Sequence, residues 1–304
     1  MKKINRREAL QKGGRLLMGA AAGVALTPFA TGCSNEDALV AVAENLRQRI
    51  EPMEIEKLKI SIVYDNYRHR KGIKADWGFS CLVEGMDRTI LFDTGRYDDI
   101  LMDNMSAMGV KAGQADIIFL SHEHPDHVGG LHTFLDHRTV AKVFKGRSMS
   151  SGVTRKAAEK GSEIVAVDNP VLVTRNSVSS GEMKSFVKNE HSLFIDTTNG
   201  VVVITGCAHP GIVDIVQRAR KLLRKEVLLV MGGFHLLMDS EGSIRDIAER
   251  LKGLDIRYVM PIHCSGSLAQ KIFKDVYGDH YLEGGVGRII TAADLPTEKQ
   301  QLIS

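Results

Sequence analysis

The hydrophobic positions of this chain fall into short runs of two kinds, which alternate from about residue 57 onward. Apolar runs rich in β-branched residues, as expected for strands, occupy 59–64, 79–83, 88–92, 115–120, 201–205, 226–231 and 258–260. Apolar residues at helical spacing cover about 97–108 and recur between Ile212 and Leu223. This alternation predicts one large α/β domain over residues 57–304.

Two segments do not follow this alternation. Residues 146–190 are rich in Ser, Gly and Lys and show neither period, so we expect a loop-rich insertion that covers a site. Residues 33–56 begin with polar side chains and contain a short helical piece, and we expect them to form a tether.

The first 32 residues have the three-part pattern of an export signal. A basic start is followed by the apolar run Leu16–Leu26, which is too short to span a bilayer as a mature helix. The pair Arg6-Arg7 resembles a twin-arginine signal, and Ala30-Thr-Gly-Cys33 resembles a lipobox. We therefore expect residues 1–32 to be removed and Cys33 to be lipidated. The alternative is an ordinary secretory signal followed by a chance cysteine.

Charge and cysteine content narrow the possible partners and environment. The whole chain carries 40 Lys and Arg against 37 Asp and Glu, but without the basic leader the remainder has a net charge of −2. A body of that charge gives no support for nucleic-acid binding. Beyond Cys33 only Cys81, Cys207 and Cys264 remain, an odd number that argues against a disulfide framework.

The strongest chemical signal follows the strand that ends at Leu120. There the chain reads Ser121-His-Glu-His-Pro-Asp-His127. In an extended segment residues two apart face the same way, so His122 and His124 can bind one ion. Asp126 and His127 face the other way as a helix begins, and they can bind a second ion. Imidazole and carboxylate donors suit Zn²⁺, Mn²⁺ or Fe.

Two further histidines follow strands. The strand at 201–205 leads to His209, and the strand at 258–260 leads to His263. A lone histidine after a strand is usually a satisfied polar residue. Here the placement recurs at successive strand ends, where α/β proteins gather their sites, and we predict both as ligands.

These residues together resemble the metallo-β-lactamase superfamily. Asp93 in Leu-Phe-Asp-Thr-Gly, the His122–His127 run, His209 and His263 occur in the order of its motifs. The stretches Tyr64-Asp-Asn66, Gly206-Cys-Ala-His-Pro-Gly-Ile212, Gly232-Gly-Phe-His-Leu236 and Pro261-Ile-His-Cys-Ser-Gly266 resemble the branch named after dihydropterin-ribofuranosylaminobenzene-phosphate synthase. The resemblance implies an αβ/βα sandwich of two mixed β-sheets flanked by helices, with metals at its edge.

The resemblance also assigns roles to the site residues. His122, His124 and His209 would hold one metal, and Asp126, His127 and His263 the other. Asp93 would orient the histidines without binding metal itself. We expect one or two divalent ions, zinc first, with manganese or iron as alternatives.

One departure from the pattern concerns the strand at 226–231. Many superfamily hydrolases place a bridging Asp after this strand, whereas here the chain reads Gly232-Gly-Phe-His235, and the nearest following carboxylate is Asp239. The second metal would then be held less tightly. His235 has three interpretations, which the sequence leaves open. It is a further metal ligand, a proton donor to the leaving group, or a residue that packs on the sheet edge.

The function that follows is an exported metal-dependent hydrolase. Coordination lowers the pKa of water from about 15.7 towards 7, so a metal-bound hydroxide is available at neutral pH. We place Asp126 and His235 among the catalytic residues. The substrate is a small ester, phosphoester, amide or lactone-like molecule, and the second partner is a membrane, through a lipid on Cys33.

The expected location is that of a bacterial lipoprotein, periplasmic or on the outer surface. The synthase name comes from methanopterin biosynthesis, which is intracellular. An exported protein that resembles the synthase would therefore act on a different substrate.

Two alternatives remain. The first is iron-dependent redox or dioxygenase-type chemistry on the same scaffold, motivated by Cys207 and Cys264 beside ligand histidines. The second is a surface lipoprotein that binds metal or ligand without turnover. For the two cysteines themselves, small apolar packing at strand ends is the simpler interpretation.

Overall fold

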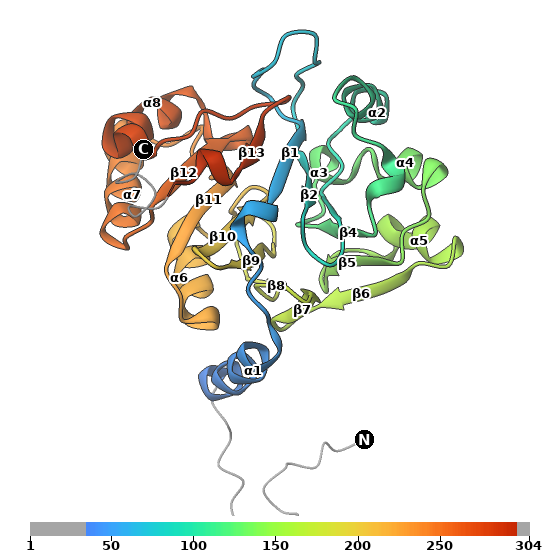
Figure 1. Cartoon of the computed structure of the whole chain (residues 1–304), viewed down its shortest axis with the longest axis horizontal. Helices are drawn as coiled ribbons and strands as arrows, with labels where there is room; N and C mark the ends of the chain where they lie inside the picture. The colour runs from blue at the N-terminus through green and yellow to red at the C-terminus, as the bar shows by residue number, and fades with distance from the viewer. Residues whose placement is uncertain (1–34, 297–304) are drawn as a thin grey trace, which may run out of the picture. The chain divides into compact units, whose positions relative to one another are not determined.

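The computed structural model describes residues 35–296, which form two mixed β-sheets flanked by helices (Figure 1). The expected export signal and Cys33 lie outside the described residues. The first sheet contains, in spatial order, β13 (Ile289–Thr291), β1 (Lys59–Tyr64), β2 (Ser80–Glu84), β3 (Ile90–Phe92), β4 (Ile117–Leu120), β5 (Lys142–Gly146) and β6 (Glu163–Val167). The second contains β12 (Tyr258–Ile262), β11 (Val227–Gly233), β10 (Gly200–Thr205), β9 (Leu193–Thr197), β8 (Ser177–Ser179) and β7 (Val171–Thr174).

Both sheets combine antiparallel and parallel pairing in the same manner. Strands β1, β2 and β3 pair antiparallel, whereas β3, β4, β5 and β6 run parallel. In the second sheet β7 to β10 pair antiparallel and β10, β11 and β12 run parallel. The carboxyl ends of β4, β10, β11 and β12, which precede the histidines, belong to these parallel parts.

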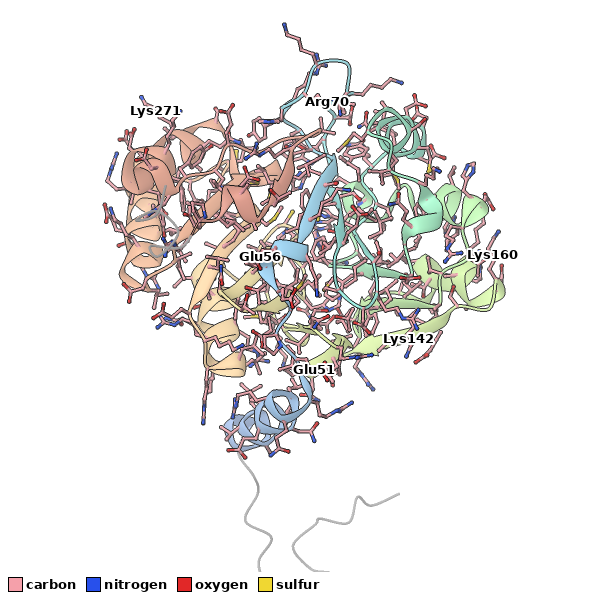
Figure 2. The ribbon with its side chains drawn as sticks, viewed as in Figure 1. Glu51, Glu56, Arg70, Lys142, Lys160 and Lys271 are labelled. Atoms are coloured by element: carbon pink, nitrogen blue, oxygen red, sulfur yellow. The ribbon has the colours of Figure 1, made fainter. Side chains whose placement is uncertain are left out.

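Helices cover the outer face of each sheet. The outer layer of the first sheet is α2 (Asp98–Ala107), α4 (Leu131–His137) and α5 (Ser151–Glu159), and that of the second is α6 (Ile212–Leu223), α7 (Glu241–Gly253) and α8 (Ser267–Tyr277). Figure 1 shows these two groups on opposite sides of the strands, and Figure 2 shows Lys160 and Lys271 pointing outward from them. The expected αβ/βα sandwich is therefore confirmed.

The core consists of three apolar layers, as this architecture requires. The middle layer lies between the sheets and includes Ile60, Phe92 and Phe119 from the first sheet and Ile204 and Met231 from the second. The outer layers fill the space between each sheet and its helices. Strands buried on both faces read as continuous apolar runs, which explains why the parallel strands β3, β4, β10, β11 and β12 could be predicted.

The segment 35–56 packs on the domain along part of its length. Helix α1 (Asn35–Arg49) lies against α6, where Ala43 and Leu46 are buried and Arg47 donates to the carbonyl oxygen of Leu222 at 2.9 Å. The apolar side chains of Ala43 and Leu46 share one face of the helix, and this face packs against α6. Among the described residues, none of the helices has the length and apolar character needed to cross a membrane.

The interpretation of 146–190 as a mostly irregular insertion is wrong. The segment contains α5, β6, β7 and β8, and it supplies one of the two edge strands of each sheet. Strand β8 reads Ser-Val-Ser and yet is buried, because Ser179 Oγ bonds to His191 Nδ1 at 2.8 Å and Ser177 Oγ to Thr174 Oγ1 at 2.8 Å. Polar residues satisfied in this way carry no hydrophobic signal.

Candidate metal centre

The run from His122 to His127 changes backbone conformation halfway along. Residues after β4 continue extended as far as His124, which precedes the short helix α3 (Pro125–Val128) with φ −107°. Pro125 at the first helical position suits this start because its missing N–H has no partner there anyway. As expected, His122 and His124 face the same way, with His122 Nε2 and His124 Nδ1 3.0 Å apart.

The two remaining strand-end histidines each meet one part of this run. His209, in the loop after β10, lies with His122 and His124, and the three ligand atoms are within 4.8 Å of one another. We call these residues the first triad. His263, directly after β12, lies likewise with Asp126 and His127, and we call these the second triad. The structure thus brings together all six residues predicted as ligands, in the two expected sets.

Four of the histidines are held by a bond to the ring nitrogen that faces away from the triads. The Nδ1 atom of His122 lies 2.9 Å from Ser121 Oγ, and that of His263 lies 3.0 Å from Asn66 Oδ1. The Nδ1 atom of His127 lies 2.7 Å from Asp93 Oδ2, and that of His209 lies 2.9 Å from Glu190 Oε2. Such outer bonds fix ring orientation in metal-binding histidines.

The donor set fits a divalent metal. His209 Nε2 is buried and has no hydrogen-bond partner, which is costly for a polar atom unless something else satisfies it. Imidazole nitrogens with one carboxylate suit zinc, manganese or iron equally, so the residues point to a divalent ion without choosing its identity.

Asp93 takes the position expected of an orienting residue. Besides His127, its carboxylate accepts the backbone N–H of Ser121 at 2.7 Å and the Ser121 hydroxyl at 2.6 Å. It therefore fixes the start of the histidine run as well as one histidine. Burial raises the pKa of Asp93, in opposition to the lowering by His127 and Ser121.

Glu190 is the residue that sequence reasoning missed. Its Oε1 accepts the Thr205 hydroxyl and the backbone N–H groups of residues 206, 207 and 208, and its Oε2 accepts both the N–H and the Nδ1 side of His209. Burial would raise the pKa of this carboxyl, but the neighbouring His122 and His209 and the N–H donors hold it well below its usual range. One buried carboxylate thus shapes the whole loop after β10.

The two triads differ in electrostatics. Burial, reinforced by the neighbouring histidines, lowers the pKa of His122 and of His124. Burial would lower the pKa of His127 too, but the Asp93 carboxylate outweighs it and raises that pKa to about 9. For Asp126, burial is outweighed by the hydrogen bond and charges of His263 and His127, which lower its pKa. In the first triad the surroundings of His122 and His124 thus favour the neutral ring, whereas in the second those of His127 and Asp126 favour the charged form.

Backbone strain is concentrated around the triads. Of the six non-glycine residues with positive φ in the described chain, Asp93 (53°), Ala208 (58°), His235 (56°) and His263 (49°) belong to this site. A non-glycine residue in the left-handed region is held there by its surroundings, and such strain is typical of functional sites. These four residues follow the ends of four different strands, β3, β10, β11 and β12, where the chain changes direction.

His235 flanks the first triad at the surface. Its ring centroid lies 4.6 Å from that of His209, and its ligand atom is within 4.8 Å of those of Cys207 and His209. A hydrogen bond in which the Cys264 sulfur accepts from the ring is the main cause that raises the pKa of His235. The location is compatible with a ligand, a proton donor or a packing role, so all three stay open.

The end of β11 has no room for the bridging Asp that many superfamily hydrolases place after this strand. A Cβ at Gly233 would lie 2.6 Å from Cys264 Sγ and closer still to the carbonyl oxygen of Gly206. Asp239 does not replace it, since its Oδ2 accepts the Ser243 hydroxyl at 3.1 Å near the start of α7. The loop is built on glycine because neighbouring backbone occupies the space.

A cavity of about 500 Å³ opens beside His209. The end of the segment 146–190 forms much of its wall, so this part does border the site as expected. Lining residues are Lys184, Ser185, Phe186, Asn189, His209 and Pro210.

Two mixed sheets with helices on both outer faces and a histidine-rich edge define the metallo-β-lactamase fold. Residues 78–158 match the family model of the metallo-β-lactamase superfamily. Among solved structures, Tm1679, described as a metal-dependent hydrolase of the β-lactamase superfamily, has a TM-score of 0.66 at 23% identity and covers 77% of this chain and 98% of its own. The family model thus matches part of the chain, and the solved structure shows that the chain has the metallo-β-lactamase fold.

Two curated relatives come from Methanocaldococcus jannaschii. One is 7,8-dihydropterin-6-methyl-4-(β-D-ribofuranosyl)-aminobenzene-5'-phosphate synthase, 26% identical over 285 residues, with 78% of this chain and 97% of the synthase covered. The other is an uncharacterized protein, 29% identical over 260 residues, with 76% of this chain and 99% of the relative covered. The chain is thus a distant homologue of the synthase.

Proposed function

We propose that this chain is a metal-dependent hydrolase that acts on a small anionic substrate. The observation that carries the proposal is the pair of triads, in which four histidines are oriented from behind and present their inner nitrogens to a shared space. The superfamily generally binds divalent metals, and Tm1679 is described as a hydrolase.

The residues divide the work of such a reaction. A bound divalent ion supplies acidity to water and positive charge against a developing anion. His122, His124 and His209 would hold one ion, and Asp126, His127 and His263 the other. Asp93 and Glu190 keep the rings in place so that no reorganisation is needed during the reaction.

The cavity beside His209 favours a substrate with negative charge. Lys184 lies in its wall. Lys188 is near enough to His124 for its ammonium to add to the lowering of the pKa of His124 that burial and His209 begin. Phe186, in the same wall, offers an apolar surface. Among the substrate classes expected, phosphoesters carry the charge that these lysines would recognise.

The decisive experiment joins elemental analysis with a substrate panel. We expect one or two divalent ions per chain and faster turnover of phosphoesters than of neutral esters, amides or lactones. His209→Ala should lose metal and turnover, whereas His132→Ala, which removes an exposed histidine on α4, should keep both. Full metal content in His209→Ala would contradict the site, and a preference for neutral substrates would contradict the substrate class.

His235 has a separate test. As a ligand it would leave His235→Ala with fewer ions, and as a proton donor it would leave the metals in place but lower the rate by a factor of about 10² to 10⁴. That loss should shrink for substrates whose leaving group needs no proton. Unchanged metal content and unchanged rate would return His235 to a packing role.

Iron-dependent redox chemistry is the second candidate, because two buried thiols, Cys207 and Cys264, lie beside the triads. Metal dependence separates the two functions. Activity with zinc or manganese alone favours hydrolysis, whereas an obligatory iron centre with turnover of an oxidisable substrate favours the alternative.

Export and lipid anchoring at Cys33 remain part of the proposal. They are supported by the leader pattern alone, and those residues lie outside the described part of the chain. Mass spectrometry of the mature N-terminus, expected to show a lipidated Cys33, is the test. An unmodified Cys33 would contradict the lipid anchor, and a protein that retains residues 1–32 would remove the argument for a substrate different from that of the synthase.

A further inference from the structure

We propose that the Cys207 thiolate is a shared metal ligand that links the two triads, an inference that rests on the metal centre proposed above. Cys207 lies in the loop after β10, two residues before His209. Its Sγ is 3.2 Å from His127 Nε2, a ligand atom of the second triad. It is also within 4.8 Å of the ligand atoms of His122 and His209, both of the first triad.

Cys207 belongs to three separate groups of metal-binding side chains. Its sulfur forms compact groups with His122 and His127, with His209 and His235, and with His263 and Cys264. Among the described residues, no other donor belongs to three such groups. A sulfur atom at that place can reach an ion in either triad.

The loop that carries Cys207 is fixed from behind. The N–H of Cys207 donates to Glu190 Oε1 at 2.9 Å, and Ala208 follows in the left-handed region. Gly206 packs so closely on Ser121 that a Cβ there would collide with the Ser121 hydroxyl. Because the backbone is held on both sides of the residue, the direction of its Cα–Cβ bond is set before any metal arrives.

The net positive charge of a two-metal centre favours a further negatively charged ligand. Two divalent ions would bring four positive charges, and among the six triad residues only Asp126 carries a negative one. The end of β11 has no room for a second carboxylate, since a Cβ at Gly233 meets Cys264 Sγ at 2.6 Å. When Sγ binds metal its proton leaves to solvent, so Cys207 adds a second negatively charged ligand beside Asp126. Zinc and cobalt both accept sulfur ligands.

Cys264 provides a matched control. It is as buried as Cys207 and lies against it, with its Sγ 3.8 Å from the carbonyl oxygen of Cys207. However, Cys264 is grouped only with Cys207 and His263, and not with the first triad. A thiol in that position cannot serve as the link between the two ions.

The test titrates Co²⁺ into the full, reduced, metal-free chain. We expect two equivalents to bind and a thiolate-to-cobalt charge-transfer band to appear in the near ultraviolet. Cys207→Ser should lose the band and bind the second equivalent at least about tenfold more weakly. Cys264→Ser should keep the band and both equivalents. X-ray absorption of the zinc-loaded wild type should show sulfur at about 2.3 Å from the metal.

Each outcome decides the matter. Two bound cobalt ions without the band would leave the metal centre standing and overturn the shared thiolate, whereas no cobalt binding would overturn both. A band that survives in Cys207→Ser, or that disappears equally in Cys264→Ser, would also overturn it. The wild-type absorption measurement decides whether sulfur binds at all if Cys207→Ser misfolds, and Cys207→Ala then serves as the second variant.

Discussion

The two halves of the sandwich supply the same edge in different ways. The first sheet delivers four predicted ligands in one run of six residues, from His122 to His127, after a single strand. The second sheet delivers His209, His235 and His263 singly, from the ends of three parallel strands. The first contribution is local in the sequence, whereas the second depends on the register of β10, β11 and β12.

The carboxylates behind the histidines show the same contrast. Asp93 holds His127 and Ser121, whose donors are a ring N–H, a hydroxyl and one backbone N–H. Glu190 is bound mainly by consecutive backbone N–H groups of the loop after β10. A hydroxyl can turn and an imidazole can change tautomer, but a backbone N–H can only donate. We therefore infer that the second half depends more strictly on its carboxylate.

Replacing each carboxylate by its amide should give the largest effect, and the loss of stability should differ between the two halves. In Glu190→Gln an NH₂ group faces backbone donors, so unfolding should become easier by about 3–5 kcal/mol. Asp93→Asn should cost less because its partners can adjust. Metal affinity should fall by about 10- to 100-fold in both, at the first triad in Glu190→Gln and at the second in Asp93→Asn.

Denaturant unfolding of the metal-free variants and titration with Zn²⁺ measure both effects. Equal stability losses in Glu190→Gln and Asp93→Asn would show that the two halves depend on their carboxylates alike, contrary to this comparison.

The same contrast explains how far the sequence could predict the site. All the ligands of the first half follow from one motif, and His209 and His263 follow from their place after apolar strands. Glu190 could not be found, because it lies at the end of a segment whose strands are short and partly polar. Its function depends on a loop that begins fifteen residues later, at Thr205, and nothing in the local pattern records that contact.

The fold shows the same division. The buried parallel strands β3, β4, β10, β11 and β12 were predicted. Among the strands that were missed are β5, β6, which is partly exposed along its length, β8, which has two buried serines, and β9. Hydrophobic periodicity detects burial of apolar side chains and is silent where polar groups are buried in satisfied pairs. The sequence also does not show how much room surrounds a residue. Only the structure shows that a side chain at Gly233 would meet Cys264.

A smaller effect concerns His191, which joins the two halves beneath the site. Its Nε2 donates to the carbonyl oxygen of Leu120 at 2.7 Å, its backbone N–H donates to that of Ser121 at 3.1 Å, and its Nδ1 accepts the Ser179 hydroxyl at 2.8 Å. Burial lowers the pKa of His191 to about 4, so the folded protein favours the neutral ring.

The stability contributed by neutral His191 should be fully present above its ordinary pKa of about 6.5 and lost as the pH falls toward 4. The loss amounts to about 3 kcal/mol. In His191→Gln the amide can still donate to Leu120 but does not titrate, so the free energy of unfolding should fall less steeply over this interval. If the free energy of unfolding falls equally steeply with pH in wild type and variant, then protonation of His191 does not destabilise the fold.

The smallest effect should come from the neutral partners. Asn66 accepts the Nδ1 side of His263 at 3.0 Å and donates to the His263 carbonyl oxygen at 3.0 Å, so it orients this histidine without carrying charge. Asn66→Ala should weaken zinc binding at the second triad by about tenfold and destabilise the fold by about 1–2 kcal/mol. Asn66→Asp keeps the acceptor for Nδ1 and should retain most of the affinity. If Asn66→Ala costs as much metal affinity as Asp93→Asn, then the charge of the partner is irrelevant and the orientation of the ring alone governs both triads.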